Sequence, residues 1–499
     1  MDSGSTRRAR RVGLLLALAA MAALTLTLGA SANVAVTIIM TDPFTNSTSQ
    51  HATKVEPDTY SSGSTIVATA QEGRFTDGGS SDLGVACSTN DGSSWTQYEM
   101  PGTTVYSTPA GPYARISDPS VAYDAKDNIW MVSGLALDAN LNGAAVTLNR
   151  SVGGCGSWQN AINVAVATGT QNFDKNWTTC DNTPTSPFYG RCYTAWDDFG
   201  HGNLLKIAYS TNGGASWTLS NTPRAGVIGS QLLTLPNGNV VDVLDNASET
   251  QLGYTISTNG GVKFGQAFVI TSITAANDPG NIRSGPLPSA EISGDGKIFA
   301  VWEDCRFRSG CPRNDLVYTT STNGSTWTTV ARIPADPGGV GGTQDSFIPG
   351  VAVDRNTSGA NIHVGIGYYY YPNSNCTEAT CQLDVGYISS TNGGSTWSAQ
   401  TMLRGPMTID WLPNTTQGRM VGDYMSSSFD SLGKAHPVFA EAYDPLPTHD
   451  CVTSTPNCNE PIETPTSGLA AAAGANVAND PVVFNGPSPH GHSAFNLVR

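Results

Sequence analysis

Acidic, arginine and aromatic residues recur together in several short segments of this chain. Two of these segments, "QEGRFTDGG" from Gln71 and "WEDCRFRSGC" from Trp302, share a glutamate that is followed by Arg-Phe. Aromatic rings can cover the faces of sugars, while carboxylate and guanidinium groups bind hydroxyl or acid groups. This combination of side chains predicts a sugar-binding site.

Two carboxyl groups that flank a glycosidic bond can hydrolyse it, one as the acid and the other as nucleophile or base. The predicted catalytic carboxylates are Glu303, Asp304 and Asp198, with Asp197 and Asp423 as further candidates. The predicted substrate-binding residues are Arg306, Arg74 and Glu72. The alternative is that these acids form salt bridges with the arginines, or bind structural calcium, and hold the loops. No metal ligand is assigned and no cofactor is predicted.

The segments between these loops indicate an all-β protein. The chain contains 54 glycines, only 13% of its residues are charged, and helical heptads are absent. Short Val, Ile, Tyr and Thr runs alternate with Gly, Asn, Ser and Pro turns, which is typical of β-strands joined by tight connections.

One turn recurs about every sixty residues, which indicates an array of similar structural units. "STNGGASW" starts at Ser210 and "STNGGSTW" at Ser390, with related copies from Ser88, Ser257 and Ser321 and a degenerate copy from Ser151. Asn can bond the backbone two residues further on, and Gly supplies a positive φ. The final Trp or Phe can bury its ring under the hairpin. We interpret the turn as structural.

The pattern Ser-x-Asn/Asp-x-Gly-x-Ser/Thr-Trp resembles the Asp box, or bacterial neuraminidase repeat, of sialidase-like β-propellers. This resemblance implies four-stranded antiparallel blades with the box between the third and fourth strands. We expect seven blades, with six as the alternative. The loops between second and third strands would then lie on the face opposite the boxes.

The resemblance also implies the residues of a sialidase: three arginines that hold the substrate carboxylate, a Tyr nucleophile with a Glu partner, and an Asp acid/base. "ARISDPS" from Ala114 resembles the first arginine motif and adds Arg115 to the substrate-binding residues. "GRMVGDYM" places Tyr424 as the candidate nucleophile, and Arg283 and Arg419 are further candidate arginines.

The domain organisation follows from composition. Residues 1–32 contain four arginines, an apolar run and Ala30-Ser31-Ala32, which predicts an export signal peptide, with a retained membrane anchor as the alternative. Residues 33–445 are assigned to the propeller. Residues 446–499, rich in Ala, Gly and Pro, are expected to pack loosely or to be disordered.

The cysteines predict five disulfides. All ten lie after the signal, and their even number and local spacing are typical of an exported chain. The predicted pairs are Cys87–Cys155, Cys180–Cys192, Cys305–Cys311, Cys376–Cys381 and Cys451–Cys458.

The charge narrows the class of partner. The whole chain carries a net charge of −15, and the signal carries +3, so the exported protein has about −18. This balance argues against nucleic acid or an anionic membrane as partner. We expect a secreted monomer that acts on a glycan or glycoconjugate as a sialidase-like glycoside hydrolase. Exo-sialidase activity is one activity that this class includes. The alternative is a non-catalytic propeller that binds a carbohydrate or a surface protein.

Overall fold

The computed structural model describes residues 34–451, 458–472, 474, 482, 483 and 495. The predicted signal peptide lies outside these residues. The described chain is built of β-strands and four single-turn 3-10 helices: Phe199–His201, Gly339–Gly341, Gly359–Asn361 and Ile409–Trp411. None of the helices in this part of the chain is long and apolar enough to cross a membrane.

Most strands form four-stranded antiparallel sheets in which consecutive strands are neighbours, so the all-β prediction is confirmed. The first sheet contains β2 (Gln50–Ser62), β3 (Thr65–Arg74), β4 (Ser80–Ser88) and β5 (Thr96–Glu99). The second contains β6 (Arg115–Asp124), β7 (Ile129–Leu137), β8 (Gly143–Val152) and β9 (Ile162–Val166), and one bridge joins it to the first. The third contains β10 (Phe173–Cys180), β11 (Cys192–Asp198), β12 (Leu204–Ser210) and β13 (Thr218–Leu219).

Three further sheets continue the same order along the chain. The fourth contains β14 (Val227–Thr234), β15 (Val240–Asn246), β16 (Gln251–Ser257) and β17 (Phe268–Ser272). The fifth contains β18 (Ser289–Ile292), β19 (Ile298–Asp304), β20 (Asp315–Ser321) and β21 (Ala331–Arg332). The sixth contains β22 (Asp345–Val353), β23 (Val364–Tyr371), β24 (Gln382–Ser390) and β25 (Thr401–Thr408).

The last sheet combines strands from both ends of the described chain. Its order is β28 (Ser426–Phe429), β29 (Lys434–Ala440), β30 (Ile462–Pro465) and β1 (Val36–Met40), and β31 (Leu469–Ala470) also pairs with β29. The strands β26 (Asn414–Thr415) and β27 (Gly418–Arg419) form a separate ribbon. The strand β30 lies in the segment that was expected to pack loosely. Pairing on both sides holds it in place, and the composition of that segment gave no sign of this.

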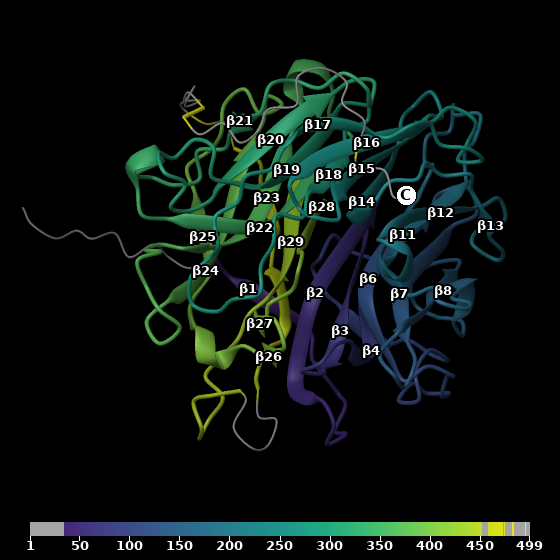
Figure 1. Cartoon of the computed structure of the whole chain (residues 1–499), viewed down its shortest axis with the longest axis horizontal. Coiled ribbons are helices and arrows are strands. Elements are labelled where there is room, and N and C mark those ends of the chain that lie inside the picture. Colours follow the sequence, from purple (N-terminus) through teal and green to yellow (C-terminus); the bar gives the residue numbers. More distant parts are fainter. Residues whose placement is uncertain (1–33, 452–457, 473, 475–481, 484–494, 496–499) are drawn as a thin grey trace, which may run out of the picture. The chain divides into compact units, whose positions relative to one another are not determined.

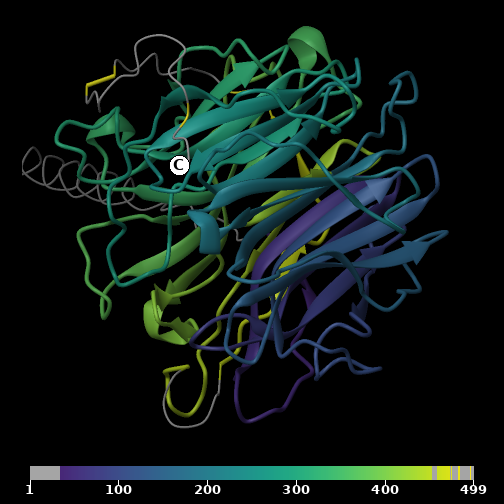
Figure 2. The same cartoon turned by 45° about the vertical axis from the view of Figure 1, so that its right-hand side comes forward.

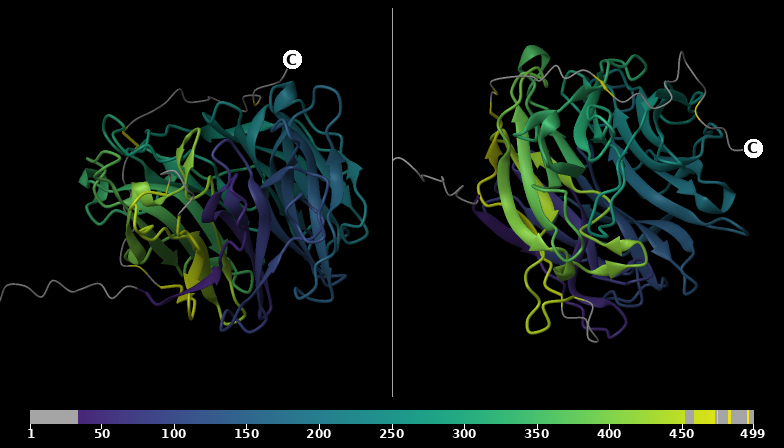
Figure 3. Two further views of the ribbon diagram at one scale, coloured as in Figure 1. Left: turned by 90° about the horizontal axis from the view of Figure 1, so that it is seen from below. Right: turned by 60° about the vertical axis from the view of Figure 1, so that its left-hand side comes forward.

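The first strands of these sheets contact one another in a continuous series. The strand β2 contacts β6, and the series continues through β10, β14, β18, β22 and β28, which contacts β2 again. In Figure 1 most of these strands lie towards the middle, while outer strands such as β13 and β25 lie at the margins. Figures 2 and 3 show the yellow C-terminal strands beside the purple N-terminal ones. The arrangement is consistent with a β-propeller.

The hydrophobic core lies between neighbouring sheets rather than in one central mass. One cluster joins Phe299 and Leu316 of the fifth sheet to Val351, Ile366 and Tyr368 of the sixth. Another joins the third sheet to the fourth. Each sheet therefore buries both of its faces, and this burial is the main favourable term in folding.

The recurrent turns follow the third strands and are held by their own side chains. After β24, the Oγ of Ser390 accepts hydrogen bonds from the N–H groups of Asn392 (3.2 Å) and Gly394 (3.0 Å). The Oδ1 of Asn392 in turn accepts from the N–H of Thr396 (2.8 Å). The turns after β4, β12 and β16 repeat this pattern. The Ser and Asn of the repeat thus serve the fold.

The five predicted disulfides are confirmed. The structure contains Cys87–Cys155, Cys180–Cys192, Cys305–Cys311, Cys376–Cys381 and Cys451–Cys458. Four of them close loops within short segments, whereas Cys87–Cys155 joins the first sheet to the turn that follows β8 in the second.

The closing aromatic residue of a turn should contribute to stability in proportion to its burial. Trp397 is only 2% exposed and packs against Tyr318, whereas Trp217 is partly exposed. We expect Trp397→Ala to lower the free energy of unfolding by about 3–5 kcal/mol, because it leaves a cavity. Trp217→Ala should cost less. Chemical denaturation followed by circular dichroism tests this, and equal losses in the two variants would contradict it.

Candidate functional site

Three neighbouring first strands bulge at an equivalent point and present a charged residue there. The pairing register shifts between Val55 and Asp58 in β2, and β6 and β10 show similar shifts. At these bulges Glu56, Asp118 and Lys175 have φ values of 55°, 49° and 51°. Residues other than glycine rarely adopt such a conformation, and a bulge re-aims the side chain that it carries. The backbone therefore turns three charged side chains out of the normal strand alternation.

Asp423, which precedes β28, connects this group through ion pairs. Its carboxylate accepts two hydrogen bonds from the guanidinium of Arg283, at 2.6 Å from Nε and 2.5 Å from the second nitrogen. The Nζ of Lys175 pairs with the same carboxylate and lies 3.6 Å from Oδ1 of Asp118. Asp118 and Asp423 therefore share one ammonium group. We call Glu56, Asp118, Lys175, Arg283 and Asp423 the axial cluster.

The first sheet adds an arginine to the edge of the axial cluster. The side-chain amide of Gln71 donates to Oε2 of Glu56, and Arg74 donates to Oε1 of Gln71 at 2.9 Å. Gly422 has a φ of 146°, and an added Cβ there would lie 2.7 Å from the backbone nitrogen of Glu56. Only glycine allows the chain before Asp423 to approach β2 this closely.

An aromatic pair lies against the axial cluster. The ring of Tyr424 meets that of Trp177 edge to face with centroids 5.5 Å apart, and the Tyr424 hydroxyl donates to the carbonyl of Pro119 at 2.9 Å. Burial and the nearby Glu56 and Asp118 carboxyl groups raise the pKa of Tyr424 well above its usual value. These surroundings disfavour the ionised form of Tyr424, which a phenolate nucleophile would require.

The carboxyl groups of the axial cluster divide into two kinds. Burial and the neighbouring Asp118 and Asp423 raise the pKa of Glu56 to about 7. Burial, with Asp174 nearby, raises the pKa of Asp118 to about 6. Burial alone would raise the pKa of Asp423 too, but Arg283 and Lys175 lower it far below its usual value. Two carboxyl groups can thus carry protons near neutral pH while the third stays ionised.

Glu303, Asp304 and Arg306 have hydrogen-bond partners outside the axial cluster. Glu303 is buried, and its Oε2 accepts the N–H of Ile348 at 3.0 Å. Asp304 holds Arg306 through two hydrogen bonds of 2.9 and 2.6 Å and also accepts the N–H of Thr274. These side chains are engaged in contacts that hold the loop after β19 and the bulge of β22.

Asp198 and Arg115 also have local partners. The carboxylate of Asp198 lies 2.8 Å from Nδ1 of His201 and accepts the N–H of Asn172. Arg115 pairs with Asp77 at 2.5 Å, and its guanidinium lies 3.8 Å from the centre of the Phe75 ring. Of the candidates from the sequence, Asp423 and Arg283 belong to the axial cluster, and Tyr424 and Arg74 lie at its edge.

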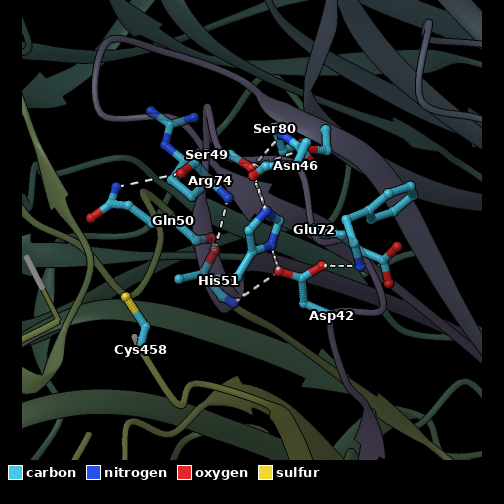
Figure 4. A network of polar contacts seen from close by, with 12 residues as sticks. Asp42, Asn46, Ser49, Gln50, His51, Glu72, Arg74, Ser80 and Cys458 are labelled. Atoms are coloured by element: carbon cyan, nitrogen blue, oxygen red, sulfur yellow. Dashed lines mark hydrogen bonds and ion pairs between the residues drawn. The ribbon is translucent and has the colours of Figure 1, made fainter. Parts of the chain in front are cut away.

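Glu72 belongs to a separate polar network, which Figure 4 shows. It forms a fully buried ion pair with Lys54. In the same network, Ser49, His51 and Asp42 follow the order of a hydrolase triad, with 2.9 Å from Oγ to Nε2 and 2.6 Å from Nδ1 to Oδ2.

This Ser-His-Asp series is not arranged for nucleophilic catalysis. The Nε2 of His51 also lies 2.8 Å from the carbonyl oxygen of Asn46. A carbonyl can only accept, so Nε2 carries a proton and cannot take one from Ser49. The hydrogen bond to Asp42 raises the pKa of His51 despite its burial. The ring is therefore a double donor that holds the segment between β1 and β2.

The described residues contain no group of three or more His, Cys, Asp or Glu side chains arranged to hold a metal ion. The calcium alternative therefore has no candidate site among them.

Sequence reasoning missed Glu56, Asp118 and Lys175. Asp118 was recognised only as the start of the strand "DPSVAYD", because its neighbours have strand propensity. A signal was present: Glu56 and Asp118 each precede a proline at the start of a first strand, as Ile348 does. The repeated residue-Pro pair marks the bulge.

Comparisons with known proteins found solved structures of glycosidases. No family model and no curated protein matches the chain. Phage phi92 endosialidase matches with 10% identity and a TM-score of 0.49 over 91% of this chain and 72% of that one. Hadza microbial sialidase Hz136 matches with 17% identity and a TM-score of 0.44 over 63% of each chain. The α-L-arabinofuranosidase Arb93A of Fusarium graminearum matches with 13% identity and a TM-score of 0.42, over 70% of this chain and 92% of that one. These TM-scores lie below 0.5, so the fold and the site are described from the chain's own sheets and contacts.

The raised pKa of Glu56 predicts a pH dependence of stability. Because Glu56 holds its proton more tightly when folded, its contribution to stability falls as the pH rises from about 4.5 towards 7. The glutamine side chain in Glu56→Gln is neutral at every pH. The wild type should therefore lose about 3 kcal/mol more of its free energy of unfolding between pH 4 and pH 8 than this variant does. Denaturation at both pH values measures this.

Glu378→Gln is the control for this experiment, since the Glu378 side chain is 44% exposed and lies in a different ion pair. In this variant the free energy of unfolding should change between pH 4 and pH 8 by the same amount as in the wild type. Identical differences in Glu56→Gln and Glu378→Gln would show that Glu56 does not bind the extra proton.

Proposed function

We propose that this chain is an exported glycoside hydrolase with a seven-bladed β-propeller fold, and that the axial cluster is its active site. The observation that carries the proposal is the clustering of two carboxyl groups whose pKa is raised, Glu56 and Asp118, with Asp423, whose pKa is lowered by two cations. Glycoside hydrolysis needs such a difference, because one group must donate a proton while another remains charged.

The contacts assign a role to each side chain. Glu56, whose pKa lies near 7, is the general acid that protonates the leaving oxygen. Asp423 acts as the ionised base or nucleophile, because Arg283 and Lys175 keep it charged. Asp118 lies against the same ammonium as Asp423 and positions Lys175. Arg74, held by Gln71, is placed to bind a sugar hydroxyl.

The contacts of the other arginines favour an uncharged glycan as substrate. An exo-sialidase would need three arginines around its substrate's carboxylate. Here Arg115, Arg306 and Arg419 form ion pairs elsewhere. We therefore favour a neutral sugar chain over a sialylated one.

The seven-blade count is supported by the continuous series of contacts among the seven first strands, from β2 to β28 and back to β2. A closed ring leaves no sheet edge unpaired between the first blade and the last. The five disulfides support export, because such bonds persist in oxidising compartments.

A non-catalytic binding propeller is the second candidate, and one observation favours it. The carboxylate of Asp423 is neutralised by two cations, as in a purely structural ion-pair network. The two candidates differ in whether bound glycan is cleaved. A binding protein would release no sugar as the wild type and would still bind glycan in the Glu56 and Asp118 variants.

Assay of the purified mature protein on a panel of neutral and sialylated glycans tests the proposal. We expect release of sugar from a neutral glycan, and a loss of turnover of about 100-fold or more in Glu56→Gln and in Asp118→Asn, because each removes a proton donor or a positioned carboxyl group. The alkaline limb of the rate profile should fall near pH 7, where Glu56 loses its proton.

Asp242→Asn is the matched control. Burial raises the pKa of Asp242 to about 7 as well, but this carboxyl group is bonded to Ser230 in the fourth sheet, away from the axial cluster. It should retain turnover while Glu56→Gln loses it. Equal activity in Glu56→Gln, Asp118→Asn and the wild type would rule out the axial cluster as the active site.

A further inference from the structure

A large cavity lies towards the opposite ends of the first strands from the axial cluster. Its volume is about 820 Å³. Five first strands contribute to its wall, from Ser61 in β2 and Glu291 in β18 to Ser427 in β28, and the segments that follow β6 and β10 add Ala125 and Asn182. Asp118 and Lys175 lie nearer the starts of their strands, and Glu56 lies at the middle of β2, before the residues that line the cavity. The cavity is therefore distinct from the axial cluster.

The charges in this wall are already paired within the protein. Arg355 lies 3.1 Å from the carboxylate of Glu291, donates to the hydroxyl of Tyr60 at 2.6 Å, and lies over the Tyr60 ring. His363 lies 3.8 Å from Asp354. Most other polar groups of the wall are hydroxyls and amides, such as Asn182 and several serines and threonines. A ligand would meet hydrogen-bonding groups and no uncompensated charge.

One hydroxyl in the wall has no partner within the described structure. Ser427 is 3% exposed, and its Oγ makes no hydrogen bond to any described residue. A buried polar atom of this kind costs free energy unless a ligand or a water satisfies it. Ser427 lines the cavity, but its Oγ is buried beside Gly367, so the side chain must rotate before a hydroxyl-bearing ligand can supply the missing bond.

A much smaller space adjoins the cavity on the side of Trp177. Tyr60, Glu291 and Arg355 line both the cavity and this void of about 20 Å³, which Trp177 also lines. This volume is enough for a water molecule but not for a sugar. Trp177 packs on Tyr424, which lies against the axial cluster. A ligand in the cavity is thus separated from Glu56 and Asp118 by packed side chains.

We propose that this cavity is a second, non-catalytic site for an uncharged oligosaccharide. Its volume falls in the range of small-molecule sites, its charges are paired, and its wall offers hydroxyl and amide groups with one unsatisfied hydroxyl. Such a site would hold a glycan on the face opposite the axial cluster and raise the effective concentration of a long chain at the protein. This inference does not depend on the axial cluster being catalytic.

Isothermal titration with three neutral trisaccharides, arabinotriose, cellotriose and maltotriose, tests the proposal. The protein is the mature chain with Glu56→Gln and Asp118→Asn, so that the probe is not cleaved. We expect at least one probe to bind. Adding Arg355→Met should weaken this binding by more than tenfold, because it removes the group that positions Tyr60 and Glu291. Adding Ser427→Ala should weaken it by about 2- to 10-fold, the effect of one neutral hydrogen bond.

Ser427→Ala is the milder change and keeps the test valid if Arg355→Met fails to fold, which circular dichroism would reveal. Loss of affinity in the cavity variants, with binding retained in the axial variants, supports the second site. Absence of binding by all three probes overturns it, as does binding that neither cavity variant weakens. If the wild type releases no sugar but the cavity variants still lose affinity, the proposed hydrolase fails and the second site stands.

Discussion

The ionised carboxylate of Asp423 is the contact on which the arrangement of the axial cluster depends. It binds Arg283, 140 residues earlier, and Lys175, 248 residues earlier, so that one side chain joins three distant parts of the chain. Two cations also hold it ionised while the adjacent Glu56 and Asp118 keep their protons more tightly. Removal of either cation would leave a buried charge without full compensation, which is costly. The same contact thus fixes both the geometry and the protonation of the cluster.

This electrostatic arrangement requires that the sheets keep fixed positions relative to one another. Hydrogen bonds between the first strands help to fix these positions. The carboxyl group of Asp58 in β2 accepts the N–H of Val121 in β6 at 2.7 Å, and Ser120 in β6 accepts that of Thr178 in β10 at 3.1 Å. Further along, Ser289 in β18 accepts an N–H from β22. These three pairs of neighbouring first strands are therefore bonded to each other directly. The charged residues at the bulges are therefore carried on a connected inner layer.

Much of the fold could be predicted from the sequence because its signals are local. The Asn and Gly of the turn from Ser390 fix that turn by their own hydrogen bonds and conformations, and the pair Cys305–Cys311 is separated by only a few residues. The sequence does not predict the strand β30, because the three residues between Pro461 and Pro465 carry no pattern, and their partners β1 and β29 lie far away or beyond a loop.

The axial cluster was harder to predict, because the direction of a side chain depends on register. Glu303 is predicted to line a sugar site, yet it lies within β19 and its carboxyl group accepts a hydrogen bond from the bulge of the neighbouring sheet. Asp118 was recognised as a strand residue, yet the bulge turns it away from the alternation that its neighbours obey. A shift of one residue reverses the face on which a strand side chain lies. Composition could therefore identify arginines and acids near one end of the sheets but not which of them meet.

The fold itself does not require charge at these bulges. Ile348, in the equivalent bulge of β22, has a φ of 50°, precedes a proline and is buried. An apolar side chain therefore fits the same backbone, and replacing buried ionic groups by apolar ones often stabilises a protein. Glu56, Asp118 and Lys175 instead keep charged or titratable groups at this depth, where each adds desolvation to the cost of its strained backbone. Isoleucine can pack at such a bulge equally well, so packing does not explain why charged residues are found there. Chemistry at the axial cluster would explain it.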